Sequence, residues 1–326
     1  MTGMRAPFQL DLHIPNFNYP DVPPESLFEK LAEIAVTAEE SGFSSLSLMD
    51  HLHQIAGIGP AENYMFEGNT MLAAIAARTS KIHLGLLVGG VTYRNPALVA
   101  KITTTLDIIS GGRAVLGIGA AWFEGEHKAY GFDFPPLKER FERLEDALQI
   151  CRAMFTQEVA SYEGKHFRVD GAFNNPKPLR GDIPILIGGS GERKTLRFVA
   201  KYADGSNFFG DLERVKHLLG VLEGHCEDVG RDPADITKTR MGTVYIASTH
   251  EAAQAKLDAA VAKAADPDRV RAQAFLGEPD EVAAQVQKYL DAGLDGVTIS
   301  MPDVHDTEAV ALAGETLGAV IGTRAA

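Results

Sequence analysis

The chain is poor in cysteine and in positive charge. Of its 326 residues only Cys151 and Cys226 are cysteines, and they do not form a Cys-x-x-Cys pair, so neither a disulfide framework nor a metal knuckle is indicated. Lysine and arginine number 31 against 44 acidic residues, which gives a formal net charge of -13. Nucleic acids and anionic membranes bind basic faces, so this charge argues against both as partners.

Long apolar runs are also missing. No run approaches the roughly 20 residues that a membrane span requires. The N-terminus places Gln9, Asp11 and His13 among its apolar residues, so it lacks the hydrophobic core of a secretory signal. With 45% hydrophobic and 23% charged residues, the composition is that of a globular protein. We therefore expect a cytoplasmic protein with one domain over residues 1–326.

Short β-rich runs alternate with longer helical segments along almost the whole chain. The strand candidates are Phe8–His13, Ser45–Met49, Ile82–Val88, Ala114–Gly119, Ile183–Ile187, Gly205–Phe209, Thr239–Ala247 and Gly296–Ser300. The helix candidates cover residues 26–42, 97–109, 138–155, 193–203, 212–229, 251–265, 279–292 and 307–322. Three stretches interrupt the rhythm as insertions, about 54–69, 156–180 with a small hairpin, and 265–276. This alternation is typical of a parallel sheet with crossover helices.

Eight strands are the number that a closed (β/α)8 TIM barrel contains. An open doubly wound sheet fits the alternation too, but it keeps ligand chemistry at one switch point. Here polar clusters follow several strands, and in a barrel such residues meet at the C-terminal mouth. These clusters are His13 and Asn16, Asp50–Gln54, Gly89–Arg94, Gly119–Glu124, Gly188–Arg193, Asn207, and Ser300–Asp303. The barrel is therefore the favoured fold.

A glycine-rich turn joins the fifth strand candidate to a helix. Gly188, Gly189, Ser190 and Gly191 let the backbone approach a ligand closely, and amides at a helix start can hold an anion. Arg193 could add positive charge. The turn is a candidate phosphate cradle, although such turns also serve only to reverse the chain.

Two histidines follow the second strand candidate. His51 or His53 could exchange a proton beside a redox ring, or both could simply bind loop backbone. Glu124, after the fourth strand, is a further candidate for proton transfer. No histidine and carboxylate set with ligand spacing accompanies them, so we expect no metal.

Small residues around Gly89 and Gly119 would let a flat ring system lie against the backbone. Trp122, the only tryptophan, follows at the same mouth. It is either a packing residue or a platform on which a ring stacks.

Together these stretches resemble the luciferase-like monooxygenase superfamily, and within it the F420-dependent oxidoreductases. The resemblance covers nearly the whole chain. Its most specific parts are Met49-Asp50-His51 with Gln54, Tyr93-Arg94-Asn95-Pro96, Gly119-Ala120-Ala121-Trp122-Phe123-Glu124, and the run from Pro184 to Arg193 followed by Tyr202-Ala203-Asp204-Gly205. It implies a TIM barrel with a deazaflavin or flavin across its mouth, and often a homodimer.

The resemblance also implies roles for individual residues. It implies a non-prolyl cis peptide at Leu87-Val88 against the central ring, an aspartate, Asp50, at the ring edge, and His51 next to the reacting carbon. The cofactor phosphate would lie on the amides of the glycine-rich turn. The remaining expected contacts are Gly89, Gly119 and Ala120 for the cofactor, and His13, Trp122 and Asn207 for the substrate pocket.

We therefore expect hydride transfer between coenzyme F420 and a small organic substrate, with His51 as the first proton-transfer candidate and His53, His13 and Glu124 next. The alternatives are a reduced-FMN monooxygenase and a non-catalytic flavin-binding protein. The F420-dependent glucose-6-phosphate dehydrogenases carry a tryptophan soon after the Asp-His pair and a glutamate after the fourth strand. This chain has Ile55 and Ala120 there, so the sugar-phosphate activity is not implied.

Overall fold

A computed structural model describes residues 7–325 of the chain. Eight parallel strands form a closed barrel, in which each strand pairs with the next and the last pairs with the first. In order around the barrel they are β1 (Leu10–Ile14), β2 (Ser45–Leu48), β3 (His83–Leu86), β5 (Ala114–Gly119), β8 (Ile185–Gly188), β9 (Gly205–Phe208), β10 (Thr237–Ile246) and β12 (Gly296–Ser300). The expected TIM barrel is confirmed.

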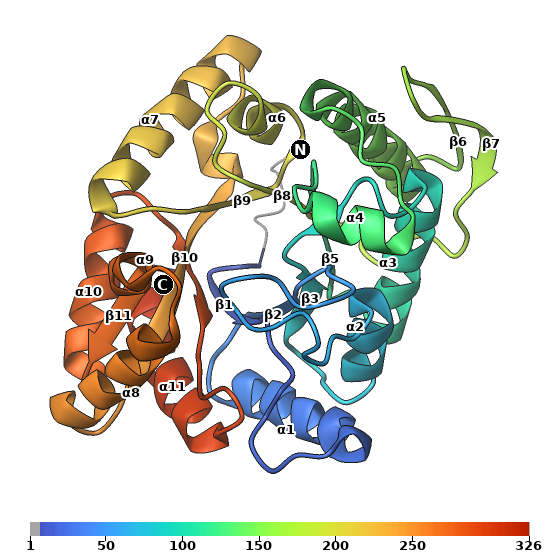
Figure 1. The fold of residues 1–326 in the computed structure, drawn as a ribbon. Helices are drawn as coiled ribbons and strands as arrows, with labels where there is room; N and C mark the ends of the chain where they lie inside the picture. The colour runs from blue at the N-terminus through green and yellow to red at the C-terminus, as the bar shows by residue number, and fades with distance from the viewer. Residues whose placement is uncertain (1–6, 326) are drawn as a thin grey trace.

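A ring of helices surrounds these strands (Figure 1). Each barrel strand is followed by one main helix: α1 (Leu27–Glu40), α2 (Gly68–Ala76), α3 (Pro96–Ser110), α5 (Leu137–Thr156), α6 (Thr195–Tyr202), α7 (Leu212–Val229), α10 (Pro279–Asp291) and α11 (Thr307–Ala325). Short 3-10 helices, η1 (Pro24–Ser26) and η2 (Pro233–Asp235), precede α1 and β10. None of the helices within residues 7–325 is long and apolar enough to cross a membrane.

Two of the insertions carry further elements. The second insertion contains the expected hairpin, β6 (Val159–Glu163) with β7 (Arg168–Phe173), which lies at the periphery beyond α5 (Figure 1). The third contains α9 (Pro267–Gln273) and leads into β11 (Ala274–Gly277), which pairs with β10 outside the barrel. Outside the insertions lie the short β4 (Gly89–Gly90) and α4 (Glu124–Tyr130), and the longer helix α8 (His250–Lys263).

Helix α2 was not among the predicted helices. It starts with Gly68, Asn69 and Thr70, residues that are typical of turns rather than helices. Glu67 starts the helix instead, because its carboxylate accepts a hydrogen bond from the amide of Thr70 at 2.7 Å. Nine residues are also too few for a clear helical period.

Alternation along the strands separates two cores. On β1, Leu10, Leu12 and Ile14 pack into a large apolar cluster with α1, whereas Asp11 and His13 point to the opposite side, into the barrel. The strands are therefore buried on both faces, as parallel strands covered by helices are.

The barrel interior has two unlike sides. On one side, Val115 of β5 and Leu186 of β8 pack with Phe8. Leu87 and Val88 lie against this cluster. Hydroxyl, amide and titratable side chains project from the strands on the other side: Asp11, His13, Ser45, Ser47, Asn207, Thr239 and Thr298. We call these the apolar side and the polar side of the barrel.

Candidate active site at the barrel mouth

A buried ion pair fixes the loop after β2. Both carboxylate oxygens of Asp50 accept hydrogen bonds from Arg94, at 2.8 and 2.9 Å, and the Gly90 amide donates to Oδ2 at 3.0 Å. Arg94 also binds Glu67 at 2.6 Å. An ionised carboxylate has about four acceptor positions, so Asp50 retains about one for another donor. The predicted contact of Asp50 with a cofactor ring stays a prediction.

Glu126, on α4, is the hydrogen-bonding centre of the mouth. Its side chain is 0% exposed. It accepts hydrogen bonds from His51 Nδ1 at 3.0 Å, from the amides of Leu52 and His53, and from the Tyr93 hydroxyl. Burial acts to raise its pKa, but these donors outweigh burial and lower the pKa of Glu126 to about 2. Glu126 is therefore a carboxylate near neutral pH.

This carboxylate determines which nitrogen of His51 carries the proton. A carboxylate can only accept hydrogen bonds, so His51 donates through Nδ1–H when it is neutral. Its Nε2 then carries a lone pair and is available as a base. His51 has the geometry of a histidine oriented by a buried acid.

Aromatic rings cover this pair. Trp122 is 62% exposed and stacks on Phe123 at 5.2 Å, and both rings meet His51 edge-on, at 5.7 and 5.9 Å. Tyr93, which also donates to Glu126, stacks on His127 at 4.6 Å. The rings limit the access of water to His51 and leave Trp122 facing outward.

The segment after β3 lies against glycines of the neighbouring strands. The Leu87-Val88 peptide is cis, as the resemblance implied. A Cβ at Gly188 would lie 2.4 Å from Val88 Cγ2, and one at Gly119 would lie 3.0 Å from the same atom. Val88 therefore fills a notch that exists because Gly119 and Gly188 have no side chains. The loops after β3, β5 and β8 consequently adjoin at the mouth.

The glycine-rich turn follows directly. Gly189 has a φ of +105°, which favours glycine. A Cβ at Gly191 would lie 2.8 Å from Thr195 Oγ1, at the start of α6. Ser190 is held by the Phe209 amide, which donates to its Oγ at 3.3 Å, and Arg193 is exposed. The turn keeps its backbone open to a ligand.

The polar side contributes His13, at the end of β1. Its Nδ1 lies 3.0 Å from Ser47 Oγ, and Ser47 donates to Asp11 Oδ2 at 2.7 Å. Burial lowers the pKa of His13 to about 4, and the nearby His51 acts in the same direction. The two histidines are therefore close enough to interact across the mouth.

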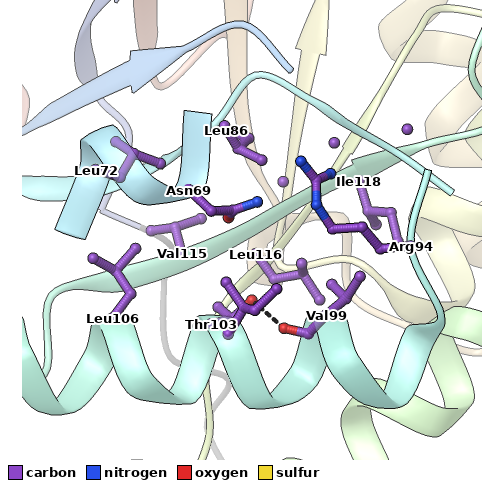
Figure 2. Close-up of a pocket in the computed structure, with 14 residues that line it drawn as sticks. Asn69, Leu72, Leu86, Arg94, Val99, Thr103, Leu106, Val115, Leu116 and Ile118 are labelled. Atoms are coloured by element: carbon purple, nitrogen blue, oxygen red, sulfur yellow. Dashed lines mark hydrogen bonds between the residues drawn. The ribbon is translucent and has the colours of Figure 1, made fainter. Parts of the chain in front are cut away.

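The small cavity behind Arg94 is a different feature (Figure 2). Its volume is about 30 Å³, and α2, α3, β3 and β5 form its walls. Figure 2 shows Asn69 and Leu72 of α2 facing Thr103 and Leu106 of α3 across it. This volume suits a water molecule rather than a tricyclic ring, so the cavity is not the cofactor site.

The structure brings most of the predicted residues to one mouth. Asp50 adjoins Gly89, whose Cβ would lie 3.5 Å from Oδ2 of Asp50, while His53 binds the Gln54 carbonyl through Nδ1 at 3.1 Å. Asn207 is buried deeper, with its amide on Thr239 and Thr298. Ala120 is partly exposed at the end of β5. The roles assigned to these residues stay predictions.

Glu126 was not among the residues predicted for the site. The predicted glutamate, Glu124, is exposed in the first turn of α4, whereas Glu126 binds His51. Helical spacing carried the signal, since Phe123, His127 and Tyr130 repeat at i, i+4 and i+7, and position i+3 shares that face. Asp11 and Ser47 were also missed, because nothing in the sequence gave the register of β1 against β2.

Comparison with known proteins agrees with this architecture. Residues 9–267 match the family model described as luciferase-like monooxygenase. The chain is 30% identical to an F420-dependent glucose-6-phosphate dehydrogenase of Kineococcus radiotolerans, over 84% of this chain and 87% of that protein. It superposes on an F420-dependent secondary alcohol dehydrogenase in complex with an F420-acetone adduct with a TM-score of 0.78 at 20% identity, over 96% and 99% of the two chains.

A long-chain alkane monooxygenase superposes with a TM-score of 0.80 at 16% identity, over 98% of this chain and 92% of that one. At such identities the superposition shows the fold alone. The family model, by contrast, spans most of the chain, from the first barrel strand to α9. The chain therefore belongs to the luciferase-like monooxygenase family.

Proposed function

We propose that the protein is an F420-dependent oxidoreductase that transfers a hydride between the deazaflavin and a small organic substrate. The observation that carries the proposal is the His51–Glu126 pair beside a rim of small residues. The 30% identical dehydrogenase, which is named as F420-dependent, supports the choice of cofactor. The deazaflavin would supply the carbon that accepts or gives the hydride.

The residues at the mouth fit such a cofactor. Leu87, Val88 and Gly89 are partly exposed next to Gly188 and offer a flat apolar edge to a ring. A side chain at Gly191 would fill the space beside Thr195. A phosphate needs that space to reach the backbone amides of the turn. We therefore place the ring against residues 87–89 and 119–120, and the phosphate on Gly188–Gly191.

The chain's own residues manage the proton. We propose that Nε2 of His51 takes the proton from a substrate hydroxyl as the hydride leaves the adjacent carbon. Glu126 would stabilise the positive charge that His51 gains, and the hydrogen bond to Nδ1 would keep the ring oriented. In the opposite direction the same nitrogen would return the proton. His53 and Glu124 remain candidates for the same step.

We propose a small hydroxyl-bearing compound or its oxidised counterpart as the substrate, above the ring and next to His13, Trp122 and Asn207. Glucose 6-phosphate is not proposed, because Ile55 and Ala120 stand where the dehydrogenases of that sugar carry tryptophan and glutamate. A panel of secondary alcohols and ketones, followed by the absorbance of F420, would identify the class.

Titration of the purified protein with F420 and with FMN tests the proposal. We expect saturable binding of F420 at micromolar concentrations and turnover of at least one alcohol in the panel. Tight binding of FMN alone, with oxygen consumption after its reduction, would indicate a monooxygenase instead. Binding of either cofactor without turnover in a broad screen would indicate a non-catalytic flavin-binding protein.

We further propose that residues 1–326 form one domain, which assembles as a homodimer in the cytoplasm and binds no nucleic acid. A groove of about 680 Å³ between α2 and α3 supports the dimer, because Leu98 and Ile102 line it and Leu98 is 52% exposed. Cys151 and Cys226 are buried free thiols, which suits a reducing compartment. Light scattering on the wild type and on Leu98→Glu would test the dimer, and we expect the variant to be monomeric.

A further inference from the structure

Three buried side chains on the polar side, those of His13, Ser47 and Asp11, form a hydrogen-bonded line. The hydride transfer proposed above assigns no role to this line. His13 Nδ1 lies 3.0 Å from Ser47 Oγ, and Ser47 Oγ lies 2.7 Å from Asp11 Oδ2. In the strand register His13 is opposite Ser47, and Asp11 is opposite Ser45. The line therefore descends from the barrel mouth by one inward-facing step of β1, and ends beneath it.

The directions of these hydrogen bonds fix the positions of the protons. An ionised Asp11 can only accept hydrogen bonds. The hydroxyl group of Ser47 therefore donates its one hydrogen bond to Asp11. Ser47 must then accept from His13, which carries its proton on Nδ1. The Nε2 atom of His13 consequently holds a lone pair, as Nε2 of His51 does.

Burial favours the uncharged form at both ends of the line. It lowers the pKa of His13 to about 4, so an imidazolium is disfavoured there. It raises the pKa of Asp11 to about 6, although the hydroxyls of Ser47, Ser45 and Thr298 act in the opposite direction. A proton that enters this line is therefore more stable on the carboxyl than on the imidazole.

We propose that His13, Ser47 and Asp11 form a proton relay, in which a proton that reaches Nε2 of His13 is stored on Asp11. A bond forms between the proton and Nε2, the Nδ1 proton moves to Ser47 Oγ, and the original hydroxyl proton of Ser47 moves to Oδ2 of Asp11. No electrons are transferred. His13 stays neutral, its tautomer reverses, and Asp11 loses its negative charge.

The groups around this line determine where else the proton could go. Among the described residues around the line, the titratable group that faces His13 is His51, which is bonded to Glu126. On β12, Thr298 adjoins Asp11, and beyond it on β9 lies the amide of Asn207, which does not titrate. A cavity of about 10 Å³ beside Asp11 is lined by Ser45, Ser47 and Thr298 and by apolar side chains of the barrel interior. His13 therefore connects Asp11 to the mouth.

The consequence, which rests on the proposed function, is a second proton-transfer group next to His51. Above the pKa of Asp11, Nε2 of His13 can accept a proton from a substrate hydroxyl. Below it, Nε2 carries a proton and can donate to a substrate carbonyl. Asp11 and Ser47 are then positioning residues that act through His13.

Nitrogen-15 NMR of the histidines tests the relay in the cofactor-free protein. The His13 signals are assigned by their loss in His13→Gln. We expect a bare Nε2 at pH 8 that becomes Nε2–H as the pH falls through about 6, while the ring stays neutral. Infrared spectra should show a protonated carboxyl appearing over the same range, absent in Asp11→Asn. A titration of His13 to imidazolium near pH 6, or an Nε2–H form at every pH, would overturn the proposal.

Substitutions separate the relay from a structural role. Asp11→Asn should keep His13 in the Nδ1–H form throughout, because an amide oxygen still accepts from Ser47 but takes up no proton. Ser47→Ala should abolish the tautomer preference, and Ser47→Thr, which retains a hydroxyl, should restore it. Ser45→Ala is the matched control, since it removes an equally buried hydroxyl near Asp11 that has no contact with His13. An equal effect of Ser45→Ala and Ser47→Ala on the His13 tautomer would refute the relay.

Turnover provides the second readout. In Asp11→Asn we expect kcat to fall about tenfold or more with KM within about twofold, and the pH profile to lose its inflection near 6. If F420 does not bind, the proposed function fails while the NMR and infrared results still decide the relay. If F420 turns over but His13 does not reverse its tautomer, the relay alone fails.

Discussion

Replacement of Glu126 by glutamine tests the central feature of the mouth. The change keeps the size of the side chain and removes its charge, in a place that is 0% exposed. In the wild type this carboxylate receives the His51 imidazole, the Tyr93 hydroxyl and two backbone amides. Glutamine can accept some of these bonds, but it cannot stabilise a proton gained by His51.

The expected magnitude follows from the lost hydrogen bond. A hydrogen bond to a charged group contributes about 1.5–3 kcal/mol. A loss of about 2–3 kcal/mol in the transition state corresponds to a fall of about 30- to 150-fold in kcat. Because the contact lies behind the imidazole, KM should change much less than kcat.

The same group makes stability depend on pH. Its donors lower the pKa of Glu126 from 4.5 to about 2, so its contribution to the unfolding free energy is complete above about pH 4.5 and disappears as the pH falls through 2. The shift corresponds to about 3 kcal/mol. Denaturant unfolding at pH 7 and pH 3 should therefore show a wild-type advantage over Glu126→Gln that shrinks at the lower pH.

Glu39→Gln is the matched control. Glu39 also accepts backbone amides, those of Ser80, Lys81 and Ile82, at the opposite end of the barrel. Its replacement should lower stability and leave kcat unchanged. If Glu126→Gln retained full kcat with His51 in its wild-type tautomer, the assignment of His51 as the oriented base would be wrong.

Three further variants probe the mouth. Arg94→Lys cannot bind both oxygens of Asp50, so we expect unfolding to become easier by about 1–3 kcal/mol in chemical denaturation, and an unchanged stability would contradict the buried pair. Gly191→Ala places a Cβ 2.8 Å from Thr195 Oγ1, so F420 affinity in a fluorescence titration should fall about tenfold or more if the turn holds the phosphate. Trp122→Ala removes a side chain that is 62% exposed, so the unfolding free energy should stay within about 0.5 kcal/mol while KM rises; an unchanged KM for every substrate would exclude Trp122 from the pocket.

The positions and order of the strands could be predicted from the sequence. Strands that are buried on both faces appear as short apolar runs, and the helices between them have clear boundaries. Asn95 and Pro96 illustrate such a boundary, where Asn95 accepts from the Ala97 amide at 2.9 Å to start α3. Helix α2 was missed because its start consists of turn-forming residues and it is stabilised by Glu67. Glutamate is not among the residues that usually cap a helix N-terminus, so the sequence did not mark this local contact between Glu67 and Thr70 as a helix start.

The site was predictable at the level of loops and not of individual contacts. Asp50, His51 and the glycine-rich turn could be placed at the mouth from their positions after strands. The partner of His51 depended on which face of α4 turns inward, and a shift of two residues separates Glu124 from Glu126. The pairing of Asp50 with Arg94 joins residues 44 positions apart, and only the assembled barrel brings them together.

The contrast between the two sides of the barrel has a consequence for redesign. Substitutions at Ser300 or Thr243, whose hydroxyls lie 3.3 Å apart near the ends of β12 and β10, face the polar side and leave the notch around Val88 untouched. In the proposed arrangement the redox group lies against the opposite set of strands, so substitutions on β9, β10 and β12 should change substrate preference and leave cofactor binding constant. Libraries confined to β9, β10 and β12 should yield new specificities without loss of cofactor loading.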